Sequence, residues 1–309
     1  MDVISRINGG NGYTVSVEIE PPLMGTGIES VFKILDPLVE LGISYVDITY
    51  HPEQIIRYDG DGTPVFQRKR PGTLDVSVAI KEKYEKKCVE PVPHIICSGF
   101  TRESTEEILT ELSYMGIRNM MALRGDPRKG PDGRFLPFAA ESGGHSHANE
   151  LIEQIASFKG DNCIGATFYP EGHKESESAE KDIYWSKVKV DAGASFLVTQ
   201  MFFDNAAYWR SVELAKKKYG IKVPIIPGVM PISLLNQLEL LPNFFGCSIP
   251  KDLRDRIERH RDDREAIRRI GIDWCVEQCL SLRENGAPSL HLFASRNAPA
   301  EEVIRAIRL

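Results

Sequence analysis

Short runs of aliphatic and β-branched residues alternate along the chain with longer segments whose apolar positions recur at the helical period. The short runs predict eight strands, at 14–19, 43–49, 92–97, 119–123, 163–168, 195–200, 223–227 and 289–294. The longer segments predict helices at 29–41, 74–86, 148–158, 179–192, 205–219, 233–241, 264–284 and 299–307, and Ser104 with Glu107 predicts a capping box that opens one more. This order is typical of repeated strand–helix units.

Eight strands, each followed by a helix, favour a closed (β/α)8 barrel of the TIM type, an α/β fold, over an open doubly wound sheet. A Rossmann domain is not expected, because the glycine-rich run at 8–12 precedes the first strand and opens no helix. We therefore expect residues 1–309 to form a single barrel domain. The connections at 51–72 and 127–147 are unusually long, and loops that follow barrel strands form the active face.

Composition narrows the class of protein further. A net charge of −6 without a basic half gives no basis for binding nucleic acid, and the basic run Arg68, Lys69 and Arg70 is interpreted as a solvated surface patch. No apolar stretch approaches the roughly 20 residues that cross a bilayer, and the N-terminus lacks a signal-peptide core, so we expect a cytoplasmic protein without membrane contact. The six cysteines form no C-x-x-C pair and are expected to be reduced structural thiols.

Polar residues end several of the predicted strands, where a barrel would collect them at one mouth. In "VSVEIEPP", the alternation directs Glu18 and Glu20 into the barrel and the aliphatic residues towards the helices. A carboxyl group desolvated there has a raised pKa and suits a general acid. The alternative for Glu18 is a pair with a lysine or arginine inside the barrel.

Three further strand ends carry candidate chemistry. "MALRGDP" places Arg124, Gly125 and Asp126 after a strand, which fits either a ligand-binding turn or a plain turn with an exposed ion pair. Gln200 offers an amide donor and acceptor that suit a heterocycle such as a pterin, or bonds to neighbouring backbone. His94 fits a hydrogen-bonded barrel histidine or a ligand contact, and neither it nor His173 has the spacing of a metal site, so no metal is expected.

Together these segments resemble the methylenetetrahydrofolate reductase family. The similarity runs in order through "VSVEIEPP", "VDITYH", "VPHIIC", "MALRGDP", "FYPEGH", "KVDAGASFLVTQMFFD" and "IIPGVMPIS". The resemblance implies an oxidoreductase barrel that binds FAD at its C-terminal mouth. It implies that NADH or NADPH reduces the flavin, which then reduces 5,10-methylenetetrahydrofolate to 5-methyltetrahydrofolate, a step of one-carbon metabolism that supplies methionine.

The resemblance also assigns roles to residues of this chain. It implies that Glu18 is the general acid towards folate, that Asp126 lies beside the flavin and tunes it, and that Gln200 contacts nicotinamide and pterin in turn. The implied flavin-binding positions are Thr49, Tyr50, His94, Arg124, Gly125, Asp126, Ala148, Tyr169, His173, Asp182 and Lys189. Gln237 matches a folate-contacting position.

Two positions depart from the family pattern. Glu20 stands where many members have an aromatic residue, and "HLFASRN" replaces the usual strand end, which leaves Arg296 as the candidate folate-binding arginine. The match covers the catalytic barrel only, so control by S-adenosylmethionine is not expected, whereas a homo-oligomer is. Two alternatives stay open: another flavin or pterin barrel, such as a proline-dehydrogenase-like oxidase or a folate-dependent methyltransferase, and a folate-binding accessory subunit that receives electrons from a partner.

Overall fold

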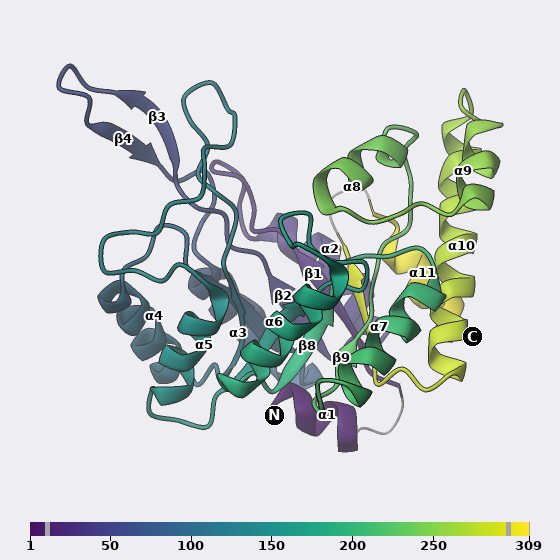
Figure 1. The fold of residues 1–309 in the computed structure, drawn as a ribbon, viewed down its shortest axis with the longest axis horizontal. Coiled ribbons are helices and arrows are strands. Elements are labelled where there is room, and N and C mark those ends of the chain that lie inside the picture. The colour runs from purple at the N-terminus through teal and green to yellow at the C-terminus, as the bar shows by residue number, and fades with distance from the viewer. Residues whose placement is uncertain (10–12, 295–297, 309) are drawn as a thin grey trace.

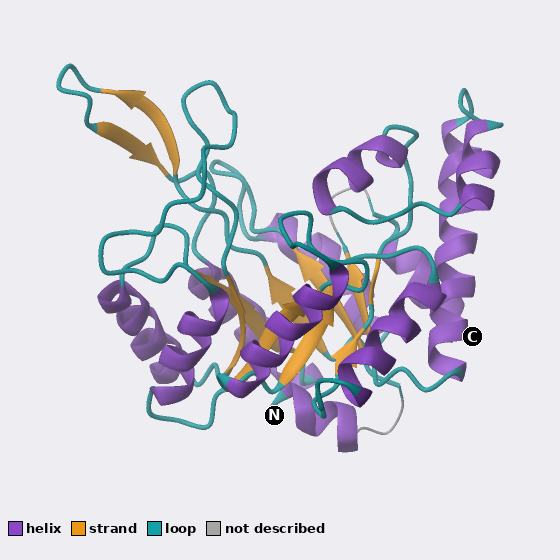
Figure 2. Cartoon of the chain, viewed as in Figure 1, coloured by secondary structure: helices purple, strands orange, loops and turns teal. Residues whose placement is uncertain are grey.

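The computed structural model, which describes residues 1–9, 13–294 and 298–308, is a parallel β/α barrel (Figure 1). Its nine strands are hydrogen-bonded in the order β10-β11-β1-β2-β5-β6-β7-β8-β9. β9 and β10 lie on either side of Pro227 and act as one broken strand, so the two ends of this order are joined by the chain. The barrel therefore has the eight strand positions that the sequence predicts, with helices around them (Figure 2).

The barrel strands are short and the helices outside them are longer. The strands are β1 (Val15–Ile19), β2 (Tyr45–Ile48), β5 (Glu90–Ile96), β6 (Asn119–Leu123), β7 (Cys163–Phe168), β8 (Phe196–Thr199), β9 (Ile225–Ile226), β10 (Gly228–Val229) and β11 (Leu290–Phe293). The helices are α1 (Val3–Gly9), α2 (Glu29–Glu40), α3 (Thr73–Tyr84), α4 (Arg102–Tyr114), α5 (Ala148–Ser157), α6 (Ala179–Asp191), α7 (Asn205–Lys217), α8 (Gln237–Phe245), α9 (Lys251–Glu258), α10 (Arg264–Glu284) and α11 (Ala300–Arg308), with a short 3-10 turn at Glu85–Lys87.

The alternation predicted for the first strand is observed. Val15, Val17 and Ile19 are buried in the large core between the strands and the helices. Ser16 and Glu18, on the opposite face of β1, lie inside the barrel, where they meet histidines from other strands. The apolar residues thus hold β1 against the helices, which fixes the direction of its polar side chains.

The lower half of the barrel interior is apolar and closed by the first helix. Tyr45, Val92, Met121 and Phe196 belong to an inner cluster that also contains Val3 of α1. The Val3 amide donates to Oδ1 of Asn119, the first residue of β6, at 3.0 Å. Because α1 covers this end, polar groups inside the barrel open only towards the other end, where the strands finish.

Several details differ from the sequence-based expectations. The long connection at 51–72 contains an antiparallel hairpin, β3 (Gln54–Tyr58) and β4 (Pro64–Gln67), which projects from the barrel in Figure 1. The predicted capping box of Ser104 and Glu107 is wrong, since Thr101 caps α4 and Ser104 occupies its third position. Helix α9 was not predicted, because its two buried residues, Leu253 and Ile257, give too little apolar signal.

Candidate active site

Glu18 lies at the barrel mouth beside a buried histidine. Its Oε2 is 3.7 Å from Nε2 of His94 on β5, and about a quarter of the Glu18 side chain (24%) is exposed. The pKa of Glu18 is raised to about 7, mainly by burial; the His94 charge opposes this rise, and the charges of Asp47 and Glu20 contribute to it. A carboxyl group with this pKa carries a proton for part of the time at neutral pH, which a general acid requires.

Sequence reasoning missed the acidic and basic groups directly beneath Glu18. Asp47 on β2 is fully buried, with Oδ1 3.7 Å from Nε2 of His94 and Oδ2 3.5 Å from Nδ1 of His291 on β11. Ser16 Oγ lies 2.9 Å from the same His291 nitrogen. The available signal was the period of two in "YVDIT" and "LHLF", which puts Asp47 and His291 on the inner faces of their strands.

Glu20 is held at the rim of the mouth by Arg70, a residue that the sequence analysis interpreted as part of a solvated surface patch. Arg70 Nη2 donates to Glu20 Oε2 at 2.7 Å, and the same guanidinium donates to the carbonyl oxygen of Pro21. The interpretation of the whole basic run as a solvated patch is therefore wrong for Arg70, whose side chain is only 14% exposed. The hairpin that precedes Arg70 brings it back to the end of β1.

The end of the second strand adds a histidine to the mouth. Thr49 Oγ1 lies 3.1 Å from Nε2 of His51. Burial lowers the pKa of His51, while the charges of Glu20 and Asp126 raise it. The ring of Tyr50 packs edge-on against Phe100 after β5, with centroids 5.1 Å apart. Thr49 and Tyr50, both expected at a flavin site, thus stand on the same side of the mouth as His94.

The Arg124-Gly125-Asp126 turn follows β6 as predicted. Gly125 has φ of +81°, and a Cβ atom there would lie 2.9 Å from Cβ of Ile96, so the turn requires glycine. Arg124 donates to Glu175 Oε2 at 2.8 Å and its guanidinium carbon lies 5.0 Å from the ring centroid of Phe138. Asp126 is exposed, and it raises the pKa of both His51 and Tyr169.

A second group of predicted residues gathers where β7 meets α6. The rings of Tyr169 and His173 are 4.9 Å apart, and the Lys189 ammonium is 6.0 Å from the Tyr169 ring centroid. Lys189 donates to the carbonyl oxygen of Thr167, and Asp182 is its acidic neighbour. Burial lowers the pKa of Lys189 to about 8. Ala148 is the first residue of α5, which packs against β6, β7 and α6.

The glutamines expected to contact substrate make local bonds in this structure. Gln200 Oε1 accepts from its neighbour's amide, that of Met201, at 3.0 Å. Gln237 Oε1 accepts from the amides of Ser233 and Leu234 at 2.7 and 2.9 Å. Both amide oxygens are therefore engaged by backbone, and a substrate role for these two residues stays a prediction. Arg296 lies outside the described residues.

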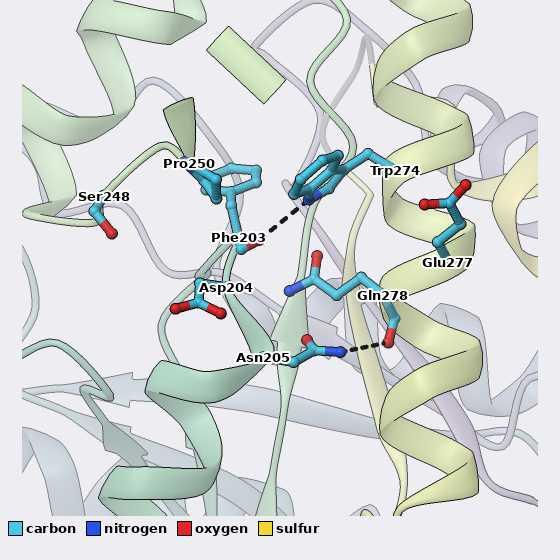
Figure 3. Close-up of a pocket in the computed structure, with 8 residues that line it drawn as sticks. All are labelled: Phe203, Asp204, Asn205, Ser248, Pro250, Trp274, Glu277 and Gln278. Atoms are coloured by element: carbon cyan, nitrogen blue, oxygen red, sulfur yellow. Dashed lines mark hydrogen bonds between the residues drawn. The ribbon is translucent and has the colours of Figure 1, made fainter. Parts of the chain in front are cut away.

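A separate pocket of about 370 Å³ lies between the start of α7 and α10 (Figure 3). Trp274 Nε1 donates to the Phe203 carbonyl oxygen at 3.1 Å, and Asn205 Nδ2 donates to that of Gln278 at 3.1 Å. These bonds anchor the loop after Gln200 to α10. The pocket does not include Glu18, His94 or Asp126, so it lies apart from the candidate active site.

Two negative findings concern the described residues only. Within 1–9, 13–294 and 298–308, no group of three or more histidine, cysteine, aspartate or glutamate side chains could hold a metal ion, so the Glu18, His94, Asp47 and His291 cluster is not a metal site in this geometry. None of the helices in these same ranges is both long and apolar enough to span a membrane. All six cysteines are free thiols.

Comparison with known proteins gives a consistent result. The model of the methylenetetrahydrofolate reductase family matches residues 4–307. The chain is 32% identical over 304 residues to methylenetetrahydrofolate reductase (NADH) 1 of Arabidopsis thaliana, covering 95% of this chain and 48% of that protein. It is 29% identical over 285 residues to 5,10-methylenetetrahydrofolate reductase of Pectobacterium carotovorum subsp. carotovorum, covering 92% and 86%. The chain thus spans about half the length of the plant relative.

The fold is also similar to a solved structure. That structure is an uncharacterised Clostridium thermocellum protein described as binding two copies of 5-methyl-5,6,7,8-tetrahydrofolic acid. The TM-score is 0.60, the sequence identity is 14%, and the match covers 99% of this chain and 97% of the other. At this identity the similarity shows the fold alone.

Proposed function

Because this chain belongs to the methylenetetrahydrofolate reductase family, we propose that it reduces 5,10-methylenetetrahydrofolate to 5-methyltetrahydrofolate, with NADH or NADPH as electron source and FAD as cofactor. The names of the plant and bacterial relatives support the reaction. The Clostridium thermocellum protein, whose described ligand is the expected product, supports the capacity of this fold to bind reduced folates.

The observation that carries the proposal is the carboxyl group of Glu18. It is desolvated inside the mouth, and its pKa of about 7 lets it hold a proton at neutral pH. Reduction of the methylene group requires opening of the five-membered ring of the folate, and a proton on the ring nitrogen makes that nitrogen a leaving group. Glu18 would donate that proton, and the open side of the mouth would admit the pterin.

The residues around the mouth fit a flavin. Gly125 lets the turn after β6 pack closely on Ile96, and this fixes the places of Arg124 and Asp126 at the mouth. Asp182 Oδ2 is buried and has no hydrogen-bond partner among the described residues, so it offers an acceptor for a bound group. A bound FAD would supply the two-electron carrier between nicotinamide and folate.

The chain's own residues would divide the work of binding. Two groups of residues would hold the cofactor. One side of the mouth carries Arg124, Ala148, Tyr169, His173, Asp182 and Lys189. The other side carries Thr49, Tyr50 and His94. Asp126 would set the charge beside the ring and favour a cationic folate. Gln200 and Gln237 would contact substrate only after releasing the backbone amides that they now accept from.

Three remaining expectations follow from the family and stand as part of the same proposal. The protein would work in the cytoplasm, in the one-carbon metabolism that supplies methionine. It would assemble as a homo-oligomer. Its preferred nicotinamide, NADH or NADPH, would be the one that bleaches the yellow protein faster at equal concentration.

The proposal is tested by separating the two half-reactions under anaerobic conditions. Nicotinamide should bleach the yellow protein, and methylenetetrahydrofolate should then restore its colour. In Glu18→Gln, bleaching should proceed at the wild-type rate, whereas recolouring should slow by about 100-fold or more, because only the second half-reaction needs the proton. Equal slowing of both half-reactions would contradict the role assigned to Glu18.

The same experiment distinguishes this reductase from the alternative enzymes and from an accessory subunit. A proline-dehydrogenase-like enzyme would be bleached by proline and would not be recoloured by the folate. A folate-dependent methyltransferase would show neither colour change. An accessory subunit that receives electrons from a partner would bind folate but stay yellow with NADH or NADPH alone. Glu20→Gln is the matched control for Glu18→Gln, since it removes an acid from the same strand end whose carboxylate already pairs with Arg70.

A further inference from the structure

Glu18 and three buried titratable side chains beneath it, each on a different strand, form a continuous series. It runs from Glu18 Oε2 to His94 Nε2 at 3.7 Å, from His94 Nε2 to Asp47 Oδ1 at 3.7 Å, and from Asp47 Oδ2 to His291 Nδ1 at 3.5 Å. Asp47 is 0% exposed and His291 is 1% exposed. The role proposed for Glu18 does not use Asp47 or His291, although a buried acid in a barrel core is costly.

The distances in this series exceed hydrogen-bond length. Neither carboxylate oxygen of Asp47, nor His94 Nε2, has a hydrogen-bond partner among the described residues. The interaction is therefore one of charge through space, in surroundings where water screens little. At such short separations, a change in the charge of Asp47 must alter the energy of the charged form of Glu18.

We propose that Asp47 and His291 are positioning residues for the proton on Glu18. In this inference, which rests on the proposed function, the Asp47 carboxylate repels negative charge on Glu18 and so keeps the acid protonated until folate arrives. His291 stabilises Asp47 in its ionised form, and the Ser16 hydroxyl fixes the His291 ring at 2.9 Å. His94 stands between the two acids.

The series has charged and titratable neighbours on several strands and at the rim of the mouth. Glu18 faces Glu20 on its own strand, Asp47 on β2 and His94 on β5. Asp47 faces His291 on β11, and its charge reaches the Tyr45 phenol on its own strand. His94 also acts on His51, and Arg70 neutralises Glu20 at the rim. Asp47 is therefore the acid that acts on Glu18 from below.

The direction of the effect follows from these charges. Burial raises the pKa of Asp47 to about 6, with His291 opposing, so at neutral pH Asp47 is mostly ionised. Burial lowers the pKa of His94 and of His291, whereas the charge of Glu18 raises that of His94 and the charge of Asp47 raises that of His291. Asp47→Asn removes a negative charge near Glu18 and should lower the pKa of Glu18. His291→Gln removes the group that favours ionised Asp47, so Asp47 should bind a proton and the pKa of Glu18 should fall as well.

The test compares the pH dependence of the recolouring half-reaction in holoenzyme variants. In wild type, its rate should fall as rising pH removes the proton from Glu18. In Asp47→Asn this fall should move to lower pH by about one unit. His291→Gln should move it in the same direction, and the double variant should move no further than Asp47→Asn alone, since both act through one carboxylate.

A second readout does not depend on activity. A protonated carboxyl group gives an infrared carbonyl band, and the band of Glu18 is the one lost in Glu18→Gln. In Asp47→Asn holoenzyme this band should disappear at a lower pH than in wild type. If Asp47→Asn fails to fold, the same titration of His291→Gln decides the question.

Ser77→Ala is the control, because Ser77 is a fully buried residue of α3 whose hydroxyl has no partner among the described residues and which does not belong to the series. It should leave the pH profile and the infrared titration unchanged. The inference is overturned if Asp47→Asn leaves both unchanged, or moves them to higher pH. Recolouring of Glu18→Gln at the wild-type rate would instead contradict the proposed function, while the infrared titration of Asp47→Asn would still report on the charge coupling.

Discussion

Arg70, from the loop between β4 and α3, donates to Glu20 Oε2 at 2.7 Å and so places a cation beside the second acid of the opening strand. Without that cation, the Glu20 charge would act more strongly on Glu18, whose pKa it already raises. Arg70 and Asp47 therefore influence Glu18 in opposite directions, one from the rim and the other from below.

The first prediction follows from this opposition. Arg70→Gln should raise the pKa of Glu18 and move the fall of the folate half-reaction to higher pH by several tenths of a unit to about one unit. It should also lower the free energy of unfolding by about 1–2 kcal/mol, because Glu20 loses a partly buried partner. The pH profile by stopped flow and urea unfolding measure the two effects.

Arg68→Gln is the control for Arg70→Gln. Arg68 comes from the same loop, but its nearest acid, Glu53, is 3.8 Å away and both side chains are well exposed. An exposed pair of this kind contributes little to stability. The pH profile of Arg68→Gln should match that of wild type, and a shift as large as that of Arg70→Gln would show that net charge, rather than the contact with Glu20, is responsible.

The second prediction concerns the turn after β6. Gly125→Ala forces a side chain into a left-handed conformation and brings its Cβ to 2.9 Å from Ile96, so the strand end must shift. We expect a loss of about 2–4 kcal/mol in unfolding free energy and purification with much less flavin. Thermal unfolding and the ratio of flavin to protein absorbance would measure this.

Gly133→Ala separates backbone strain from the clash. Gly133 lies in the same long loop with φ of +78°, but a Cβ there meets nothing within 4 Å. The substitution should cost about 1 kcal/mol and leave the flavin content unchanged. If both variants lose flavin equally, the loop as a whole, and not the close approach at Gly125, determines cofactor binding.

Most of the barrel could be predicted because its signal is local. Val15, Val17 and Ile19 alternate with Ser16 and Glu18, and this pattern determines which way β1 faces whatever its neighbours are. The period of α10 was equally clear, and its predicted bounds match the observed helix. The hairpin of β3 and β4 was missed, since its mixed charges and its bulge between Ile55 and Arg57 hide the alternation.

The site was harder to predict because its contacts join distant parts of the chain. Asp47 and His291 are separated by most of the sequence, and only closure of the barrel brings them within 3.5 Å. Arg70 reaches Glu20 only because the hairpin returns the chain to β1. The alternation of β1 alone was enough to predict that the Glu18 side chain points into the barrel. The residues that it contacts there depend on strand order and register, which no local sequence pattern determines.

The third prediction concerns the buried ammonium of Lys189. Its pKa in the folded protein is about 8, against 10.5 for an ordinary lysine, because burial disfavours the charged form. Between these values the unfolded chain binds the proton and the folded chain does not. The contribution of Lys189 to stability should therefore rise with pH from about 8 to about 10.5 and stay constant below that window.

Lys189→Met removes this pH dependence. As pH rises from about 8 to about 10.5, the unfolding free energy of wild type should therefore increase relative to that of the variant. Urea unfolding at several pH values between about 8 and 10 measures it. Lys187→Met is the control, because Lys187 belongs to the same helix but pairs with Asp191 at its surface. A parallel pH dependence in wild type and Lys189→Met would mean that the Lys189 ammonium stays charged in the folded protein. Its bonds to Thr167 and its attraction to Asp182 would then outweigh the cost of burial.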